Sequence, residues 1–280
     1  MPSENGAAAG KGGISGQIAE ILALSNDSKK KTFVVAIALC LVCAVFVASA
    51  AVFLRPLQIE NQALDRQVNI LEVAGLLEEG KSIDALFQQI EPRVIDLETG
   101  EYVDDVDPAT YDQRAAAKDP QRSVVLPPEI DVAKIGRRAK YATVYLVKGE
   151  GDQVKTIILP IHGYGLWSTM YAYLALQGDA NTVAGINFYE QGETPGLGAE
   201  ITNPVWRAQF KDKLIYDESG KPRIEVVKGK ANPSGPNAQY QVDGLAGATL
   251  TAQGVLHLLQ YWLGEDGFGP YLAKMRSQRG

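Results

Sequence analysis

The chain has 280 residues, of which 46% are hydrophobic and 21% charged, and its formal net charge at pH 7 is −6. This composition is typical of folded protein and excludes disorder of the whole chain, and the length allows about two domains. The negative charge offers no basic footprint for nucleic acid. The two cysteines, Cys40 and Cys43, are too few for an iron–sulfur cluster.

The N-terminal part predicts a tail followed by a membrane span. Residues 1–28 are rich in Gly, Ala and Ser and predict a flexible tail. Three lysines at 29–31 then precede an apolar run over 32–54, which is about 34 Å long as a helix and exceeds a hydrocarbon core of about 30 Å. We therefore predict a transmembrane helix over 29–55. The alternative is a signal peptide cleaved near 48–50.

The charges beside this span predict its orientation. Lys29, Lys30 and Lys31 lie on the N-terminal side, against Arg55 alone on the other. Positive charge favours the cytoplasmic side, so we expect a cytoplasmic tail and a main domain outside the cytoplasm. In a bacterium this corresponds to a single-pass protein of the inner membrane with a periplasmic domain.

Residues 56–135 are predicted to form a peripheral helical subdomain. Apolar residues recur among polar ones over 57–77, Gly80 interrupts the pattern, and 82–90 predicts a second short helix. The acidic stretch that follows predicts a solvated face.

Residues 136–280 are predicted to form an α+β domain with an antiparallel sheet and peripheral helices. The ranges 141–147, 154–161, 170–175 and 182–189 have the alternation and β-branched content of strands, and the last two predict a hairpin. The irregular placement of helices disfavours a doubly wound fold.

A turn of small residues, Asp243-Gly-Leu-Ala-Gly-Ala-Thr249, leads into an apolar helix predicted over 252–263. Glycine and alanine let backbone N–H groups approach a ligand, and a helix N-terminus favours negative charge, so a phosphate would fit here. The alternative is a tight loop before a core helix, with Thr251 as the N-cap.

The turn resembles the flavinylation motif Asp-x-x-(Ser/Thr)-Gly-Ala-Thr, in which the last Thr carries FMN through a phosphoester bond. Asp243, Gly247, Ala248 and Thr249 match it, whereas Ala246 stands where the family usually has Ser or Thr. The resemblance thus implies that Thr249 is the FMN acceptor and leaves Thr251 as the helix cap.

Two glycine-rich loops follow predicted strands. The first, over 162–169, carries Leu166 and Trp167, and the second, over 192–200, carries two carboxylates and a proline. Close backbone and apolar side chains form a suitable wall for a flat heteroaromatic ring. From the second loop we assign Glu193, Thr194, Gly196 and Leu197 to this wall.

Together the span, the two loops and the motif resemble the C subunit of the sodium-translocating NADH:quinone oxidoreductases, from about residue 30 to the C-terminus. The resemblance implies an extracytoplasmic FMN-binding domain over 136–280 and an electron-transfer subunit that is not catalytic alone. It also implies other membrane subunits of the complex as partners, and a flavin transferase during maturation. The alternatives are a G-type subunit of an Rnf complex, or a membrane-anchored module that binds FMN or another phosphate ligand noncovalently.

The expected site has no catalytic residue and no metal. Its cofactor-binding residues are Thr249, which would bear the covalent FMN, with Asp243, Gly247, Ala248, Leu250, Thr251, Leu166, Trp167, Glu193, Thr194, Gly196 and Leu197.

Overall fold

The structure is a computed structural model that describes residues 23, 25, 28–149, 151 and 153–278. The tail predicted over 1–28 lies outside the described residues, apart from 23, 25 and 28. The chain divides into two compact units, one ending at Ala63 and the other beginning at Leu64. Everything described below from Leu64 onward belongs to the second unit.

The predicted span is part of one long helix, α2, which runs over Lys29–Ala74. Within the described part of the chain it is the one helix long and apolar enough to cross a membrane, and its most apolar window has a mean hydropathy of 2.9. The helix continues through Pro56. Arg55 and Pro56 therefore mark the end of the apolar run and not the end of the helix.

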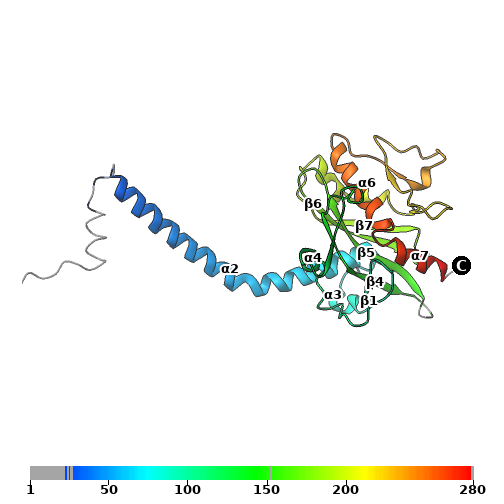
Figure 1. Ribbon diagram of the computed structural model, residues 1–280, viewed down its shortest axis with the longest axis horizontal. Coiled ribbons are helices and arrows are strands. Elements are labelled where there is room, and N and C mark those ends of the chain that lie inside the picture. The colour runs from blue at the N-terminus through cyan, green and yellow to red at the C-terminus, as the bar shows by residue number, and fades with distance from the viewer. Residues whose placement is uncertain (1–22, 24, 26–27, 150, 152, 279–280) are drawn as a thin grey trace, which may run out of the picture. The chain divides into compact units, whose positions relative to one another are not determined.

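The second unit is built on one sheet of five strands in the order β1-β4-β5-β6-β7. All neighbouring strands in it are antiparallel, and β6 and β7 form the predicted hairpin. The antiparallel α+β fold is thus confirmed (Figure 1). The strands are β1 (Ile90–Asp96), β4 (Tyr141–Lys148), β5 (Val154–Tyr164), β6 (Thr169–Gln177) and β7 (Val183–Glu190).

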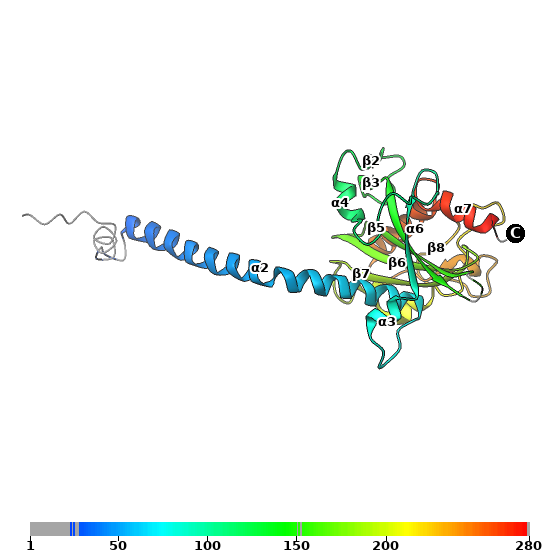
Figure 2. The same ribbon diagram turned by 90° about the horizontal axis from the view of Figure 1, so that it is seen from below.

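The remaining elements of the second unit lie around the sheet (Figure 2). The helices are α3 (Ile83–Phe87), α4 (Gln113–Lys118), α5 (Pro204–Ala208), α6 (Thr249–Leu263) and α7 (Gly269–Ser277), with 3-10 turns η2 (Gly198–Thr202) and η3 (Ala238–Tyr240). The strands β2 (Ser123–Val125) and β3 (Arg137–Ala139) pair antiparallel, whereas β8 (Glu225–Val226) and β9 (Gln241–Val242) pair in parallel.

The prediction of a separate helical subdomain over 56–135 needs correction. The expected short helix is present as α3, but β1 lies in the same segment and pairs with β4 along its whole length, from Ile90 opposite Val147 to Asp96 opposite Tyr141. Pro92 interrupts the strand pattern in the sequence. An edge strand tolerates proline because one side of its backbone needs no partner, so β1 is the edge of the main sheet.

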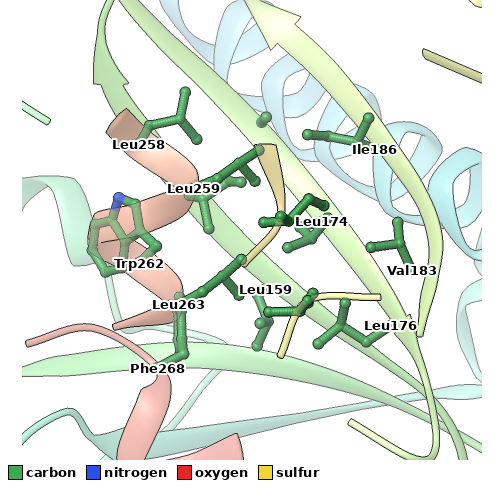
Figure 3. Close-up of a cluster of buried hydrophobic side chains, with 14 of the residues drawn as sticks. Leu159, Leu174, Leu176, Val183, Ile186, Leu258, Leu259, Trp262, Leu263 and Phe268 are labelled. Atoms are coloured by element: carbon green, nitrogen blue, oxygen red, sulfur yellow. The ribbon is translucent and has the colours of Figure 1, made fainter. Parts of the chain in front are cut away.

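Alternate side chains of the strands pack on opposite faces of the sheet. Leu159 of β5 belongs to a core that includes Leu259 and Trp262 of α6, and Figure 3 draws the side chain of Leu259 between α6 and the strands. Ile158, the preceding residue, packs with Ile70 near the end of α2 on the other face. This period of two fixes α6 against one face of the sheet. The start of α6 is thereby held beside the loops at the ends of β5 and β7.

Candidate functional site

Three segments that lie far apart in the sequence meet at the carboxylate of Glu193. Its Oε1 accepts hydrogen bonds from the backbone N–H groups of Leu166 (3.1 Å), Trp167 (3.0 Å) and Ser168 (3.2 Å). Its Oε2 accepts from the hydroxyl of Thr251 in α6 at 2.7 Å, and from Leu166 N–H at 3.2 Å. The carboxylate thus joins both glycine-rich loops to the first turn of α6.

The backbone at the glycines around this carboxylate packs so closely against it that a Cβ atom would clash. A Cβ at Gly165 would lie 2.5 Å from Glu193 Oε1, and a Cβ at Gly198 would lie 2.5 Å from Thr251 Oγ1 and 2.9 Å from Glu193 Oε2. Gly254 allows α6 to approach the end of β5 closely, since a Cβ at Gly254 would lie 2.7 Å from the carbonyl oxygen of Tyr164. Glycine is required at these positions by close approach.

Glu193 is a buried acidic residue, with 5% of the residue exposed. Burial by itself raises its pKa, but the hydrogen bonds from Thr251 and from the backbone of the 166–168 segment act more strongly together and hold the pKa below its ordinary value. At neutral pH the group is therefore an anion that only accepts hydrogen bonds.

Helix α6 begins three residues earlier than the start at residue 252 that the sequence pattern predicted. Its first residue is Thr249 and its N-cap position is Ala248, so the prediction that Thr251 caps the helix is wrong. Thr251 is a helical residue whose side chain is 1% exposed. Its hydroxyl donates to the Glu193 carboxylate, whereas the hydroxyl of an N-cap threonine would accept from a backbone N–H group. The prediction of the helix start assumed the second arrangement and therefore placed the start too late.

Thr249 and Thr251 occupy opposite environments. A helix turns about 100° per residue, so side chains two positions apart point about 200° apart. Thr251 points into the protein, whereas Thr249 is exposed, as predicted. The turn before them needs Gly247, which has φ +72° and whose Cβ would lie 3.1 Å from Leu197 Cδ2. Of the two hydroxyls, the one on Thr249 is open to a ligand.

The N-terminus of α6 can hold an anion. No side chain caps it among the described residues, and the first intrahelical bond of this turn runs from Ala252 N–H to Ala248 C=O. The N–H groups of the first helical residues therefore have no helical acceptor, and together with the helix dipole they favour negative charge. A phosphate joined to Thr249 would lie at this end.

Exposed apolar side chains surround the start of α6. The exposed fractions are 38% for Leu166, 66% for Trp167, 43% for Leu197 and 56% for Leu250. Such a group of large apolar side chains on a surface is typical of a binding site. Apolar side chains next to a helix N-terminus fit a ligand with a flat ring at one end and a phosphate at the other, which is the chemistry of FMN.

Other predicted site residues have structural contacts of their own. The Asp243 carboxylate accepts from Ala231 N–H at 2.8 Å, and the Asp243 carbonyl accepts from the Trp206 indole at 2.8 Å. These bonds close the loop before the motif turn. Thr194 and Gly196 are exposed, and Ala248 is buried. The Thr194 carbonyl accepts from Leu197 N–H at 3.1 Å and so shapes the second loop.

Sequence reasoning missed Ser168 and Trp206. The Ser168 hydroxyl accepts from Gly192 N–H at 2.6 Å and ties the two glycine-rich loops together directly. A hydroxyl beside glycines was the only signal in the sequence, and it is too common to be specific. The contact of Trp206 with Asp243 crosses 37 positions and has no local signal.

Two clefts lie elsewhere on the domain, with volumes of about 900 and 530 Å³, and neither is lined by Thr249, Thr251 or Glu193. His162 lines the smaller one and stacks on Tyr171, with ring centroids 5.4 Å apart. Burial, assisted by the positive charge of Arg114, lowers the pKa of His162 to about 4. His162 is thus neutral at pH 7.

The comparisons with known proteins agree with this geometry. The FMN-binding domain family matches residues 165–264, which include residues 165–169 of the first loop, Glu193 and the start of α6. The chain is 57% identical to the C subunit of the Na(+)-translocating NADH-quinone reductase of Vibrio vulnificus over 253 residues, covering 90% of this chain and 97% of that protein. It is 51% identical to the protein of the same name from Pseudomonas aeruginosa over 256 residues, covering 90% and 98%.

Solved structures are also similar. The crystal structure of Shewanella oneidensis NqrC superimposes with a TM-score of 0.69 at 32% identity, covering 76% of this chain and 97% of that one. The crystal structure of the C subunit of the Na(+)-translocating NADH-quinone reductase from Parabacteroides distasonis gives a TM-score of 0.61 at 30% identity, covering 78% and 96%.

Proposed function

The chain belongs to the family formed by the C subunit of the Na+-translocating NADH-quinone reductases, an oxidoreductase complex, and on this premise we propose that Thr249 carries FMN through a phosphoester bond. The observation that carries the proposal is the contrast between the two threonines at the start of α6. Thr249 is exposed beside an uncapped helix N-terminus, whereas Thr251 is buried and bonded to Glu193.

The attachment needs a donor of FMN and an accessible hydroxyl. We propose FAD as the donor and a flavin transferase as the enzyme. The Thr249 oxygen attacks the phosphorus on the FMN side of the pyrophosphate, a new P–O bond forms, the pyrophosphate bond breaks and AMP leaves, while the hydroxyl proton is released. The exposure of Thr249 allows the transferase to reach it.

The bonded phosphate keeps one negative charge. The N–H groups at the start of α6 are suited to hold that charge, because they have no helical acceptor. Leu166, Trp167 and Leu197 are proposed to contact the flavin ring and its chain, since they are exposed and apolar at the same end of α6. When bound, FMN supplies the redox chemistry, and the protein sets its position and surroundings.

The protein is proposed to pass electrons between other subunits of the complex. It has no NAD fingerprint and too few cysteines for an iron–sulfur cluster, so electrons must come from and go to partners. Its relatives are named for sodium translocation, and the movement of sodium by the complex of this chain is part of the proposal.

We place the domain that follows the span on the periplasmic side of a bacterial inner membrane. The support is the unequal charge beside the apolar part of α2, with three lysines before it and Arg55 after it. A reporter that is active only in the periplasm, fused after Gly280, should be active. Activity of a cytoplasm-only reporter at the same junction would contradict this orientation.

Denaturing electrophoresis followed by peptide mass spectrometry tests the attachment. Covalent flavin fluoresces in the gel, whereas a noncovalently bound FMN is lost, which separates the proposal from a simple FMN-binding module. Trypsin releases the segment from Ala231 to Lys274, which contains both threonines, and fragmentation assigns the adduct between them. A protein band without flavin fluorescence after expression with the transferase would contradict the proposal.

A further inference from the structure

We infer that Glu193 is a positioning residue, whose buried carboxylate holds the Trp167 loop and the first turn of α6 in the arrangement that presents the Thr249 hydroxyl for flavin attachment. The inference rests on the proposed function of Thr249. It assigns to Glu193 an action through its neighbours, in place of the direct contact with the flavin that the loop pattern predicted.

The contacts of Glu193 leave no lone pair directed outward to a ligand. Oε1 receives three backbone N–H groups and Oε2 receives the Thr251 hydroxyl and a second contact from Leu166. Gly165 and Gly198 close against the same oxygens. With 5% of the residue exposed, the carboxylate cannot act by touching a ligand. Its effect must pass through the groups that it holds.

The bond from Thr251 fixes the rotation of the first turn of α6. If this turn rotated or frayed, Thr251 would leave the carboxylate, and Thr249, which points about 200° away, would move with it. On the other side, Glu193 gathers three successive N–H groups of residues 166–168 and so gives the loop one conformation. One side chain thereby sets both the acceptor and the apolar wall beside it.

This role depends on the shape and acceptors of the side chain more than on its charge. Glutamine at this position can direct its carbonyl oxygen to the three N–H groups and its NH2 group to Thr251, whose hydroxyl can accept as well as donate. Glu193→Gln therefore keeps most of the hydrogen bonds. Glu193→Ala keeps none of them and leaves three N–H groups and one hydroxyl without their partner.

The experiment compares Glu193→Ala and Glu193→Gln with the wild type, as full chains in detergent with FAD and the flavin transferase. Initial rates at varied concentrations of the acceptor protein give kcat and KM. Hydrogen–deuterium exchange of the flavin-free proteins follows the amides of 166–168. In Glu193→Ala we expect kcat to fall about tenfold or more with a KM near the wild-type value, because a misplaced acceptor reacts slowly even when bound.

The amides of 166–168 should also exchange about tenfold or more faster in Glu193→Ala, because they lose their acceptor. Glu193→Gln should restore most of both properties. Wild-type kcat or wild-type amide exchange in Glu193→Ala would overturn the inference, and so would a glutamine variant as slow as the alanine variant.

A second pair of variants covers the case in which Glu193→Ala does not fold. Thr251→Val keeps the shape of the side chain and removes the hydroxyl, whereas Thr251→Ser keeps the hydroxyl. A lower kcat in the valine variant alone supports the inference, and equal rates in both overturn it. If the wild type itself acquires no covalent flavin, the proposed function fails, while the exchange data still decide whether Glu193 holds the loop.

Discussion

The hydroxyl of Thr251 donates a 2.7 Å hydrogen bond to the buried carboxylate of Glu193. This bond gives two threonines that are two residues apart different roles. It directs Thr251 into the protein, and the geometry of the helix then directs Thr249 to the surface. Variants of the two threonines should therefore separate attachment of the flavin from stability of the fold.

Thr249→Ala should abolish the covalent flavin and leave the fold intact. Because the side chain is exposed, the free energy of unfolding should change by no more than about 0.5 kcal/mol. Thr249→Ser is the matched control, since it keeps a hydroxyl at the same position. In-gel fluorescence and mass spectrometry measure the attachment. A flavin adduct that persists in Thr249→Ala would refute the assignment.

Thr251→Val should destabilise the domain. The buried carboxylate loses a hydrogen bond, and bonds to charged groups contribute about 1.5–3 kcal/mol. Thr251→Ser should lose less, because its hydroxyl can still reach Glu193. Urea unfolding of both variants measures the difference. Equal stability of the valine and serine variants would show that this bond contributes little.

The sequence could predict the central strands and the exposed position of Thr249, and the reasons are local. The strand segments alternate apolar and polar residues or are rich in β-branched residues such as Val144 and Ile158. The motif around Thr249 is a contiguous stretch and can be read without knowledge of the fold. Two features could not be predicted from the sequence, for physical reasons. Pro92 interrupts the strand pattern of β1, so the edge strand was not predicted. The hydrogen-bond partner of Thr251 lies 58 positions away, so no local pattern distinguished a buried helical threonine from an N-cap.

Trp167→Ala should leave the flavin attached and alter its absorption spectrum or its reduction potential. The Trp167 backbone is held by Glu193, so its loop should keep its conformation, while the exposed indole is lost. Leu250→Ala, which removes another exposed side chain near Thr249, is a useful comparison. If neither the spectrum nor the potential differs from wild type, Trp167 does not contact the ring.

Alanine substitutions at Gly196 and Gly198 should have different effects although they lie two residues apart. A Cβ at Gly198 would collide with Thr251 and Glu193, so Gly198→Ala should displace the carboxylate and lower the rate of flavin attachment. A Cβ at Gly196 meets no atom within 4 Å, and its φ of +74° costs a non-glycine residue about 1–2 kcal/mol.

The attachment rate and the stability of each glycine variant are to be measured together. Gly196→Ala should lose stability and keep most of the rate. Gly198→Ala should lose both. A Gly198→Ala protein that is flavinylated as fast as Gly196→Ala would argue against the close packing around the carboxylate.

The domain should lose stability as pH falls from 7 toward 5, in part through His162. Its pKa in the folded protein is lowered to about 4, first by burial and then by the charge of Arg114, against an ordinary value of 6.5. Between these values the unfolded chain binds a proton that the folded chain does not. Stability from the neutral ring is therefore complete above pH 6.5 and is lost as pH falls toward 4, by up to about 3 kcal/mol.

His162→Phe keeps a flat ring to stack on Tyr171 and cannot titrate. Between pH 7 and 5 most carboxylates remain ionised. In this range the free energy of unfolding of the variant should depend less on pH than that of the wild type. His257, the other histidine, is only partly buried, so His257→Gln should change the slope less. An NMR titration of the His162 ring gives its folded pKa directly. A value near 6.5, or equal slopes in the wild type and His162→Phe, would contradict this account, because the proton would then bind the folded and unfolded chains alike.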